Sequence, residues 1–280
     1  METGLRFNKM IGVIIFHKDS RKSYEERWIR KFVDSIVNQT FKDFTIYEIN
    51  YGGDDYSVIS EYSDGSIKSH KFFNIKMENH VYAMNYIIDI AFSDGCDFVF
   101  NTNIDDYYDV SRIEKQLPYL ESGSDVCSTD FYYVRDNRRN DIVTELKRMS
   151  GFGDIRGNFN NGHNVIAHPS VAYSRKLWDD GNRYDGEKIP EEDFIFWKTL
   201  IEKGYRFDIV PMALLFYRLH NGQVSRVDVL PEFDEEIDNI RANKKPAPRI
   251  QIQTPVEKIR KIDKRDLANE NNPVQPRQRQ

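Results

Sequence analysis

Two acidic clusters in this sequence could do chemistry together. The first, Asn103-Ile104-Asp105-Asp106, begins two residues after the apolar run Phe98-Val99-Phe100. The second, Glu191-Glu192-Asp193, directly precedes Phe194-Ile195-Phe196-Trp197. A carboxylate at the carboxyl end of a strand can hold a divalent metal ion, whereas one that opens a helix is fixed and points into the crevice above a sheet. The first cluster could therefore serve a metal ion and the second a proton.

The first half of the chain alternates apolar strands with amphipathic helices, which would position the first cluster. The run Met10 to Phe16 is rich in β-branched residues, and Trp28, Phe32 and Ile36 recur every four residues in the segment that follows. Strands are expected near residues 10–16, 45–50, 72–76 and 98–101, and helices near residues 24–38 and 81–92. This alternation predicts an α/β fold with a mostly parallel sheet, helices on both of its faces, and ligands at the carboxyl ends of the strands.

The second half is less regular. Two strands, residues 126–134 and 142–147, are joined by a charged turn, and residues 151–163, rich in Gly and Asn, are expected to form a mobile loop. A helix over residues 193–203 is followed by two strands, at residues 206–209 and 213–219. From Arg241 the chain has no aromatic residues and holds five prolines, so residues 241–280 are expected to form an extended or disordered tail.

Composition narrows the class of protein. The 280 residues include 2 cysteines, too few for a disulfide framework, and the apolar run at residues 11–16 is too short for a signal peptide or a membrane span. A soluble, cytoplasmic protein is expected. From Arg241 onward 11 Lys and Arg residues stand against 4 Asp and Glu, a net charge of +7, so the overall charge of −5 leaves −12 on residues 1–240. An acidic body repels phosphates, and the basic tail offers no rings for bases to stack on, so no nucleic-acid partner is expected.

Several short motifs, taken in order, resemble a family 2 glycosyltransferase of the GT-A fold. They are Asn38-Gln39-Thr40-Phe41, Gly52-Gly53, Ala83-Met84-Asn85, Asp105-Asp106, Glu192-Asp193 with the apolar run after it, and Tyr217-Arg218-Leu219-His220. The resemblance spans roughly residues 11–225. It implies a Rossmann-like, mostly parallel central sheet flanked by helices in a single domain, residues 1–240, with a nucleotide-sugar-binding half through about residue 107 and a smaller acceptor half over about residues 108–230.

The resemblance also implies a role for each motif. The run Asn103 to Asp106 occupies the place of the family's D-x-D-D motif, so Asp105, together with His220, is a candidate ligand of Mn²⁺ or Mg²⁺. Asp193, with Glu192 beside it, is the candidate catalytic base. The candidate contacts of the nucleotide sugar are His17, Lys18, Asn50, Asn85, Asn103, Ile104 and Asp106, and those of the acceptor are His168 and Trp197.

The implied activity is inverting transfer of a hexose from a nucleotide sugar to a hydroxyl of a glycan or protein acceptor. UDP is the nucleotide that the resemblance favours, with GlcNAc or glucose as the sugar. Because Asn103, Asn50 and Met84 each replace a charged residue of the family's pattern, a catalytically degenerate module that binds a sugar nucleotide or a glycan is the alternative. A sugar-nucleotide pyrophosphorylase is less favoured, since residues 17–22 contain no glycine for a phosphate loop. The sequence leaves the formation of a homo-oligomer open.

Overall fold

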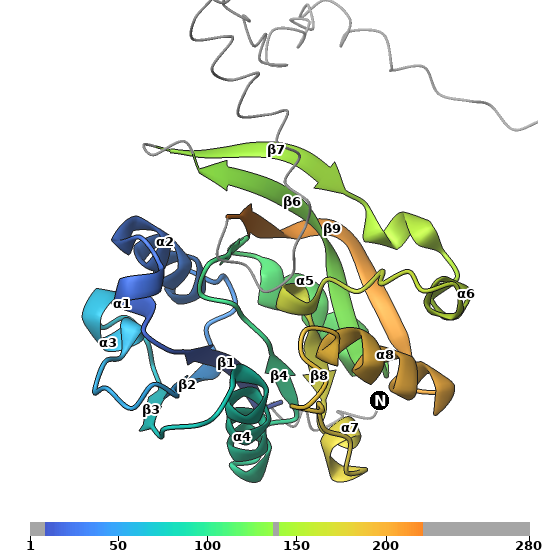
Figure 1. Ribbon diagram of the computed structural model, residues 1–280, viewed down its shortest axis with the longest axis horizontal. Helices are drawn as coiled ribbons and strands as arrows, with labels where there is room; N and C mark the ends of the chain where they lie inside the picture. The colour runs from blue at the N-terminus through green and yellow to red at the C-terminus, as the bar shows by residue number, and fades with distance from the viewer. Residues whose placement is uncertain (1–8, 137–139, 221–280) are drawn as a thin grey trace, which may run out of the picture. The chain divides into compact units, whose positions relative to one another are not determined.

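In the residues that the structure describes, nine strands form one mixed sheet (Figure 1). The computed structural model describes residues 9–136 and 140–220, and the expected tail, residues 241–280, lies outside them. The strands are β1 (Ile11–His17), β2 (Phe44–Asn50), β3 (His70–Asn74), β4 (Phe98–Phe100), β5 (Tyr107–Tyr108), β6 (Val126–Asp136), β7 (Asp141–Lys147), β8 (Ala172–Ser174) and β9 (Phe207–Leu219). Their order across the sheet is β3-β2-β1-β4-β8-β6-β9-β5, and β7 pairs with β6.

Strands β3, β2, β1 and β4 are parallel, so their carboxyl ends lie along one edge of the sheet. Ile11 at the start of β1 pairs with Phe44 of β2 and Phe98 of β4, and His17 at its end pairs with Asn50. Next to them, β8 is antiparallel to both β4 and β6, and β9 is parallel to β6. The polar residues that follow β1 and β4 therefore reach the edge where sheets of this kind bind ligands.

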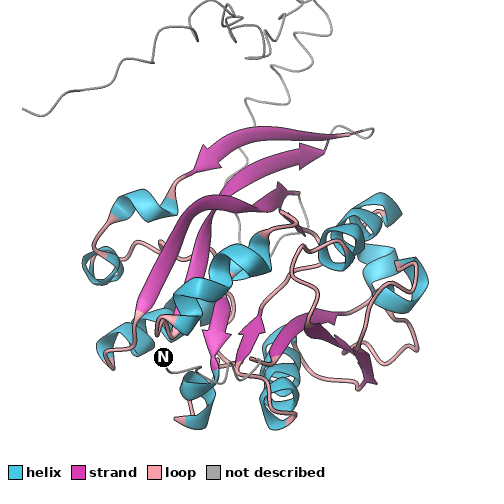
Figure 2. Cartoon of the chain, turned by 180° about the vertical axis from the view of Figure 1, so that it is seen from behind, coloured by secondary structure: helices cyan, strands magenta, loops and turns pink. Residues whose placement is uncertain are grey.

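Helices cover both faces of the sheet, each face with its own apolar core (Figures 1 and 2). Side chains of α2, α3 and α5 belong to one core and those of α4, α7 and α8 to the other, as the alternation of side chains along the strands requires. The helices are α1 (Ser20–Ser23), α2 (Glu26–Val37), α3 (Val58–Tyr62), α4 (His80–Ser93), α5 (Arg112–Glu121), α6 (Ile155–Asn160), α7 (Arg175–Asp179) and α8 (Glu192–Glu202), with the 3₁₀ turns η1 (Met149–Phe152) and η2 (His168–Ser170). Within the described ranges, every helix is too short or too polar to cross a lipid bilayer.

The predicted α/β fold is confirmed, but two details of the second half are wrong. The two strands expected at residues 206–209 and 213–219 form one strand, β9, which begins at Phe207 and runs without a break to Leu219. The gap between the two expected strands coincides with a shift in the register of β9 against Asp130 of β6. Pro211 lies at this point, and proline has no N–H to donate to a β-ladder.

The segment predicted as a mobile loop, residues 151–163, contains the helix α6 and part of η1. The side chain of Asp154 accepts a hydrogen bond from the backbone N–H of Gly157 and so caps α6. The ring of Phe159 is buried and stacks on that of Phe194 at a centroid distance of 5.2 Å. A helix of six residues is too short to produce a periodic pattern, and this explains why the segment reads as a loop.

Candidate active site

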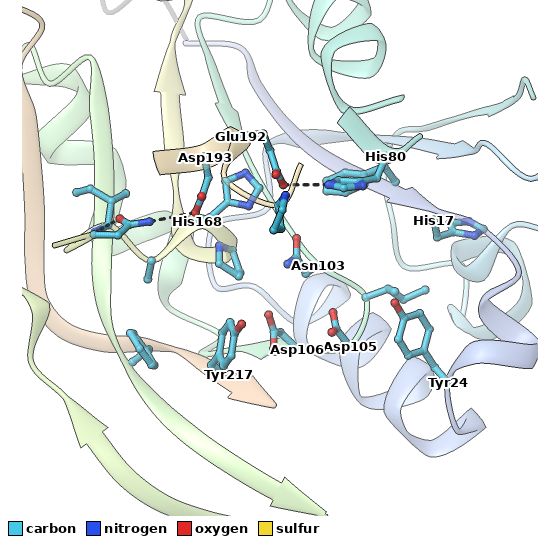
Figure 3. A pocket seen from close by; sticks show the side chains of 18 of the residues that line it. His17, Tyr24, His80, Asn103, Asp105, Asp106, His168, Glu192, Asp193 and Tyr217 are labelled. Carbon is cyan, nitrogen blue, oxygen red and sulfur yellow. Dashed lines mark hydrogen bonds and ion pairs between the residues drawn. The ribbon is translucent and has the colours of Figure 1, made fainter. Parts of the chain in front are cut away.

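A pocket of about 420 Å³ lies where the carboxyl ends of β1 and β4 face the first turn of α8 (Figure 3). It brings together most of the residues singled out in the sequence, namely His17, Lys18, Asn103, Ile104, Asp105, Asp106, His168, Glu192 and Asp193. Residues of both acidic clusters therefore line one pocket.

The turn after β4 is fixed by hydrogen bonds that leave Asp105 facing the pocket. The hydroxyl of Tyr108 accepts a hydrogen bond from the backbone N–H of Asn103 (2.8 Å). Asp106 is buried, and its Oδ1 accepts a hydrogen bond from the backbone N–H of Arg218 (2.8 Å). Burial, together with the neighbouring charge of Asp105, raises the pKa of Asp106 well above its usual range. Asp106 therefore ties the turn to β9, and Asp105 is the carboxylate available to a ligand.

Asp105 and His220 form a pair of side chains that fits a divalent metal ion. Nε2 of His220 lies 2.9 Å from Oδ2 of Asp105, and the rings of Tyr24 and Trp28 pack against the imidazole. Close by, Oδ1 of Asn103 is buried and accepts no hydrogen bond from any described residue. A buried acceptor without a donor is a place where a cation or a ligand's donor group is expected.

The described residues contain no group of three or more His, Cys, Asp or Glu side chains that could hold a metal ion by themselves. Mg²⁺ and Mn²⁺ at phosphate sites need fewer protein ligands, because they take one or two carboxylates and complete their shell with phosphate oxygens and water. The donor set of Asp105, His220 and Asn103 therefore fits an ion that binds together with a diphosphate.

Asp193, near the start of α8, has the properties of a proton acceptor. Its Oδ2 accepts a hydrogen bond from Nδ2 of Asn164 (3.2 Å), and its Oδ1 accepts one from the backbone N–H of Phe194 (2.6 Å). Burial raises the pKa of Asp193, although the nearby imidazole of His168 opposes the effect. A carboxylate of raised pKa is a stronger base, and these contacts hold it in a fixed direction.

Glu192, the preceding residue, lies in a different environment. Its Oε1 is 3.0 Å from Nε2 of His80, the first residue of α4, whereas its Oε2 is buried without a partner among the described residues. Burial disfavours the ionised form, but the hydrogen bonds from His80 and from the residue's own backbone N–H, with the charges of His80 and His168, together outweigh it and lower the pKa of Glu192. His80 is absent from the sequence-based predictions; the signal for it is a polar residue at a helix start, directly after the capping residue Asn79.

His17, at the end of β1, is held by a buried acidic residue that the sequence-based predictions also omit. Oε1 of Glu48 lies 2.9 Å from Nε2 of His17, and Oε2 lies 2.8 Å from Nε2 of His70. Burial disfavours ionisation of Glu48, but the hydrogen bonds from both imidazoles lower its pKa to about 2. A single acidic residue inside the apolar strand β2 is the sequence signal that points to it. Lys18, one residue on, is exposed and lines the rim of the pocket.

Four of the predicted site residues lie outside the pocket lining: Asn50, Asn85, Trp197 and His220. His220 reaches the pocket through its contact with Asp105. Asn50 is buried, where its side chain accepts a hydrogen bond from the backbone N–H of Gly52 and donates one to the carbonyl oxygen of Tyr56. Asn85 exchanges two hydrogen bonds with the backbone of Tyr184. Trp197 is fully buried in the core and packs near the ring of His168. In the structure these side chains bond or pack within the fold, and contact with a ligand stays a prediction for them.

Comparisons with known proteins identify the family and the fold of this chain. The family model described as glycosyl transferase family 2 matches residues 13–181. An uncharacterised glycosyltransferase of Methanocaldococcus jannaschii is 28% identical over 207 residues, which cover 70% of this chain and 67% of that protein. The O-antigen biosynthesis glycosyltransferase WbnJ of Escherichia coli is 25% identical over 235 residues, which cover 79% of this chain and 84% of WbnJ.

Solved structures share the fold at low sequence identity. The structure of S. aureus TarS in complex with UDP-GlcNAc matches with a TM-score of 0.57 and 18% identity, over 83% of this chain and 65% of that chain. The mannosyltransferase PcManGT of Pyrobaculum calidifontis, in complex with GDP-Man and Mn²⁺, matches with a TM-score of 0.55 and 13% identity, over 76% of this chain and 58% of that chain. This chain thus spans less than two thirds of each solved chain. Since the family model covers more than half of the sequence, the chain belongs to glycosyl transferase family 2 and is a glycosyltransferase of the GT-A fold.

Proposed function

We propose that this protein transfers a hexose from a UDP-sugar to a hydroxyl of an acceptor, with inversion at the anomeric carbon and with help from Mn²⁺ or Mg²⁺. The observation that carries the proposal is that one pocket holds both Asp105, paired with His220, and Asp193, a carboxyl group of raised pKa. The complexes of TarS with UDP-GlcNAc and of PcManGT with GDP-Man and Mn²⁺ support a nucleotide sugar as the donor.

The donor side of the pocket is the edge where β1 and β4 end. Asp105 and His220, with Asn103 beside them, would hold the metal ion, and His17 and Lys18 would contact the nucleotide. When bound, the ion would neutralise the negative charge that develops on the departing diphosphate. In this proposal residues 1–107 bind the nucleotide sugar, and residues 108–230 bind the acceptor.

The transfer itself is a single displacement in which Asp193 handles the proton. The acceptor hydroxyl gives its proton to the carboxylate of Asp193 while its oxygen forms a bond to the anomeric carbon. The bond from that carbon to the diphosphate oxygen breaks, and the electron pair leaves with the diphosphate. Attack from the face opposite the leaving group inverts the anomeric centre, so no covalent intermediate on the protein is required.

A glycan acceptor is favoured over a protein acceptor by three aromatic side chains. Phe131, Tyr133 and Tyr217 line the pocket, and their ring centroids lie 5.2 to 5.8 Å apart. Such rings offer apolar faces on which the C–H faces of a pyranose can pack.

Titration calorimetry tests this proposal directly. UDP, GDP, TDP and several UDP-sugars are titrated with Mn²⁺ and with EDTA, and the tight binders are then tested for transfer to sugar acceptors. Metal-dependent binding of UDP and a UDP-sugar, followed by turnover, is the expected result. Binding without turnover on any acceptor would favour the degenerate binding module, and preference for GDP or TDP would overturn the choice of nucleotide.

A further inference from the structure

We propose that Glu192 and His80 form the subsite for the transferred sugar, in which His80 positions the carboxylate of Glu192 and Oε2 of Glu192 accepts a hydrogen bond from a sugar hydroxyl. This inference rests on the proposed function, since it concerns the sugar part of the donor. It gives Glu192 a binding role in place of the catalytic role that the sequence predicts.

The first observation is an unused acceptor at the pocket wall. Glu192 lines the pocket and is 8% exposed, yet its Oε2 has no partner among the described residues. Buried carboxylate oxygens are nearly always hydrogen-bonded, because an unpaired one loses its hydration without compensation. A ligand that donates a hydrogen bond to Oε2 of Glu192 would give this oxygen its missing partner.

The second observation is the way in which His80 sets the direction of this oxygen. His80 opens α4, and the side chain of Asn79 fixes that helix end by accepting hydrogen bonds from the backbone N–H groups of Val81 (3.0 Å) and Tyr82 (3.1 Å). An ionised carboxylate only accepts hydrogen bonds, so Nε2 of His80 donates to Oε1 of Glu192 across their 3.0 Å separation. With one oxygen engaged by an imidazole on another helix, the carboxylate cannot rotate freely, and Oε2 stays at the pocket.

The third observation is the place of Glu192 among the other groups. In Figure 3 the carboxylate of Glu192 lies between the side chain of Asp193 and the ring of His80, and Asn103 lines the same pocket. The negative charge of Glu192, added to that of Asp193, would repel a phosphate, so the diphosphate is not its partner. The acceptor hydroxyl is already the partner proposed for Asp193. A neutral donor group fits the remaining space, and the hydroxyl-bearing ring between the diphosphate and the acceptor is the transferred sugar itself.

The test compares the affinity of the protein for UDP alone with its affinity for UDP-GlcNAc, UDP-glucose and UDP-galactose in the presence of Mn²⁺, measured by calorimetry without an acceptor. The measured quantity is the Kd for UDP divided by the Kd for the UDP-sugar. This ratio reports how much the sugar adds to the affinity and so isolates the sugar subsite from the nucleotide site. In Glu192→Gln the amide oxygen would take the hydrogen bond from His80 and leave an NH₂ group toward the sugar. We expect this change to lower the ratio for the best-bound sugar about tenfold, with the Kd for UDP unchanged, because a hydrogen bond to a charged acceptor is lost.

Variants of His80 separate positioning from folding. His80→Leu should lower the same ratio, whereas His80→Gln, whose amide can still donate to Glu192, should restore much of it. Glu202→Gln is the matched control, because Glu202 is exposed at the opposite end of α8. Thermal unfolding of each variant checks that it folds.

The outcomes are distinct. A ratio that is the same in Glu192→Gln and His80→Leu as in the unaltered protein would overturn the inference and leave the proposed function standing. A fall in the affinity for UDP itself, with the ratio unchanged, would overturn it too, since it would place Glu192 at the nucleotide. Failure of the unaltered protein to bind any nucleoside diphosphate would overturn the proposed function and the inference together.

Discussion

Glu192 and Asp193 are consecutive residues at the start of α8, yet the structure shifts their pKa values in opposite directions. Burial raises the pKa of Asp193. Burial also disfavours the charge on Glu192, but the hydrogen bond from His80 and the other favourable contacts of the carboxylate together outweigh this effect and lower the pKa of Glu192. Two neighbouring acids whose environments separate their pKa values can take different roles, one as a base and one as a permanent hydrogen-bond acceptor.

Asp193→Asn should abolish most transfer and leave nucleotide binding intact. Asn keeps the size of the side chain and can still accept a hydrogen bond from Asn164, but it cannot take a proton from the acceptor. We expect kcat to fall by about 10² to 10⁴-fold, with the calorimetric Kd for UDP unchanged. Glu202→Gln, on the same helix, should match the unaltered protein in both measurements. Retained transfer in Asp193→Asn would assign the base to another residue.

The rate of transfer should depend on pH through Asp193. The base acts only when it is ionised, so activity is lost as pH falls through its pKa. Because burial raises that pKa, the acid limb of kcat/KM should lie above the value of about 3.9 that is typical of an exposed Asp. The residual activity of Asp193→Asn should lack this limb. The same acid limb in both proteins would show that a different group is titrating.

Asp105→Asn should remove the metal dependence of nucleotide binding. The variant loses the negative charge beside His220 but keeps the shape of the turn, which Asp106 fixes through the backbone of Arg218. We expect EDTA to weaken UDP binding in the unaltered protein and to have little effect in Asp105→Asn, whose affinity with Mn²⁺ should match that of the unaltered protein with EDTA. Equal sensitivity of the two proteins to EDTA would place the metal ion elsewhere.

Short-range patterns predict much of this fold and the main parts of its site. Buried strands and amphipathic helices are recognised by the spacing of their apolar residues. An acidic cluster at the end of a strand or helix can be seen in the same pattern. The clusters Asn103–Asp106 and Glu192–Asp193 stand out in this way, and in the structure residues of both line one pocket, whereas their roles stay predictions.

Pairings between distant side chains could not be predicted in this way. His80 and Glu192 are separated by 112 positions, and their contact depends on how α4 and α8 are placed against the sheet. Glu48 reads as an isolated charge in β2 until His17 and His70 are seen on either side of it. Periodicity gives the face on which a side chain lies, but it does not give the partner that it meets across the fold.

Glu48 should also govern stability at low pH. Its pKa is about 2 in the folded protein, against an ordinary value of 4.5. A lowered folded-state pKa means that the stabilisation is complete above about pH 4.5 and is lost as pH falls toward 2. The contribution at neutral pH is at most about 3 kcal/mol.

Glu48→Gln tests this assignment, because it removes the charge that His17 and His70 share and keeps the volume of the side chain. At pH 7 the variant should have a lower free energy of unfolding in urea than the unaltered protein, and the difference should shrink as pH falls from 4.5 toward 2. Glu121→Gln, which alters an exposed residue at the end of α5, should have little effect at any pH. If the loss of unfolding free energy in Glu48→Gln is the same at every pH in this range, the loss comes from packing rather than from the charge. In that case the carboxylate is not the group that holds His17 in place.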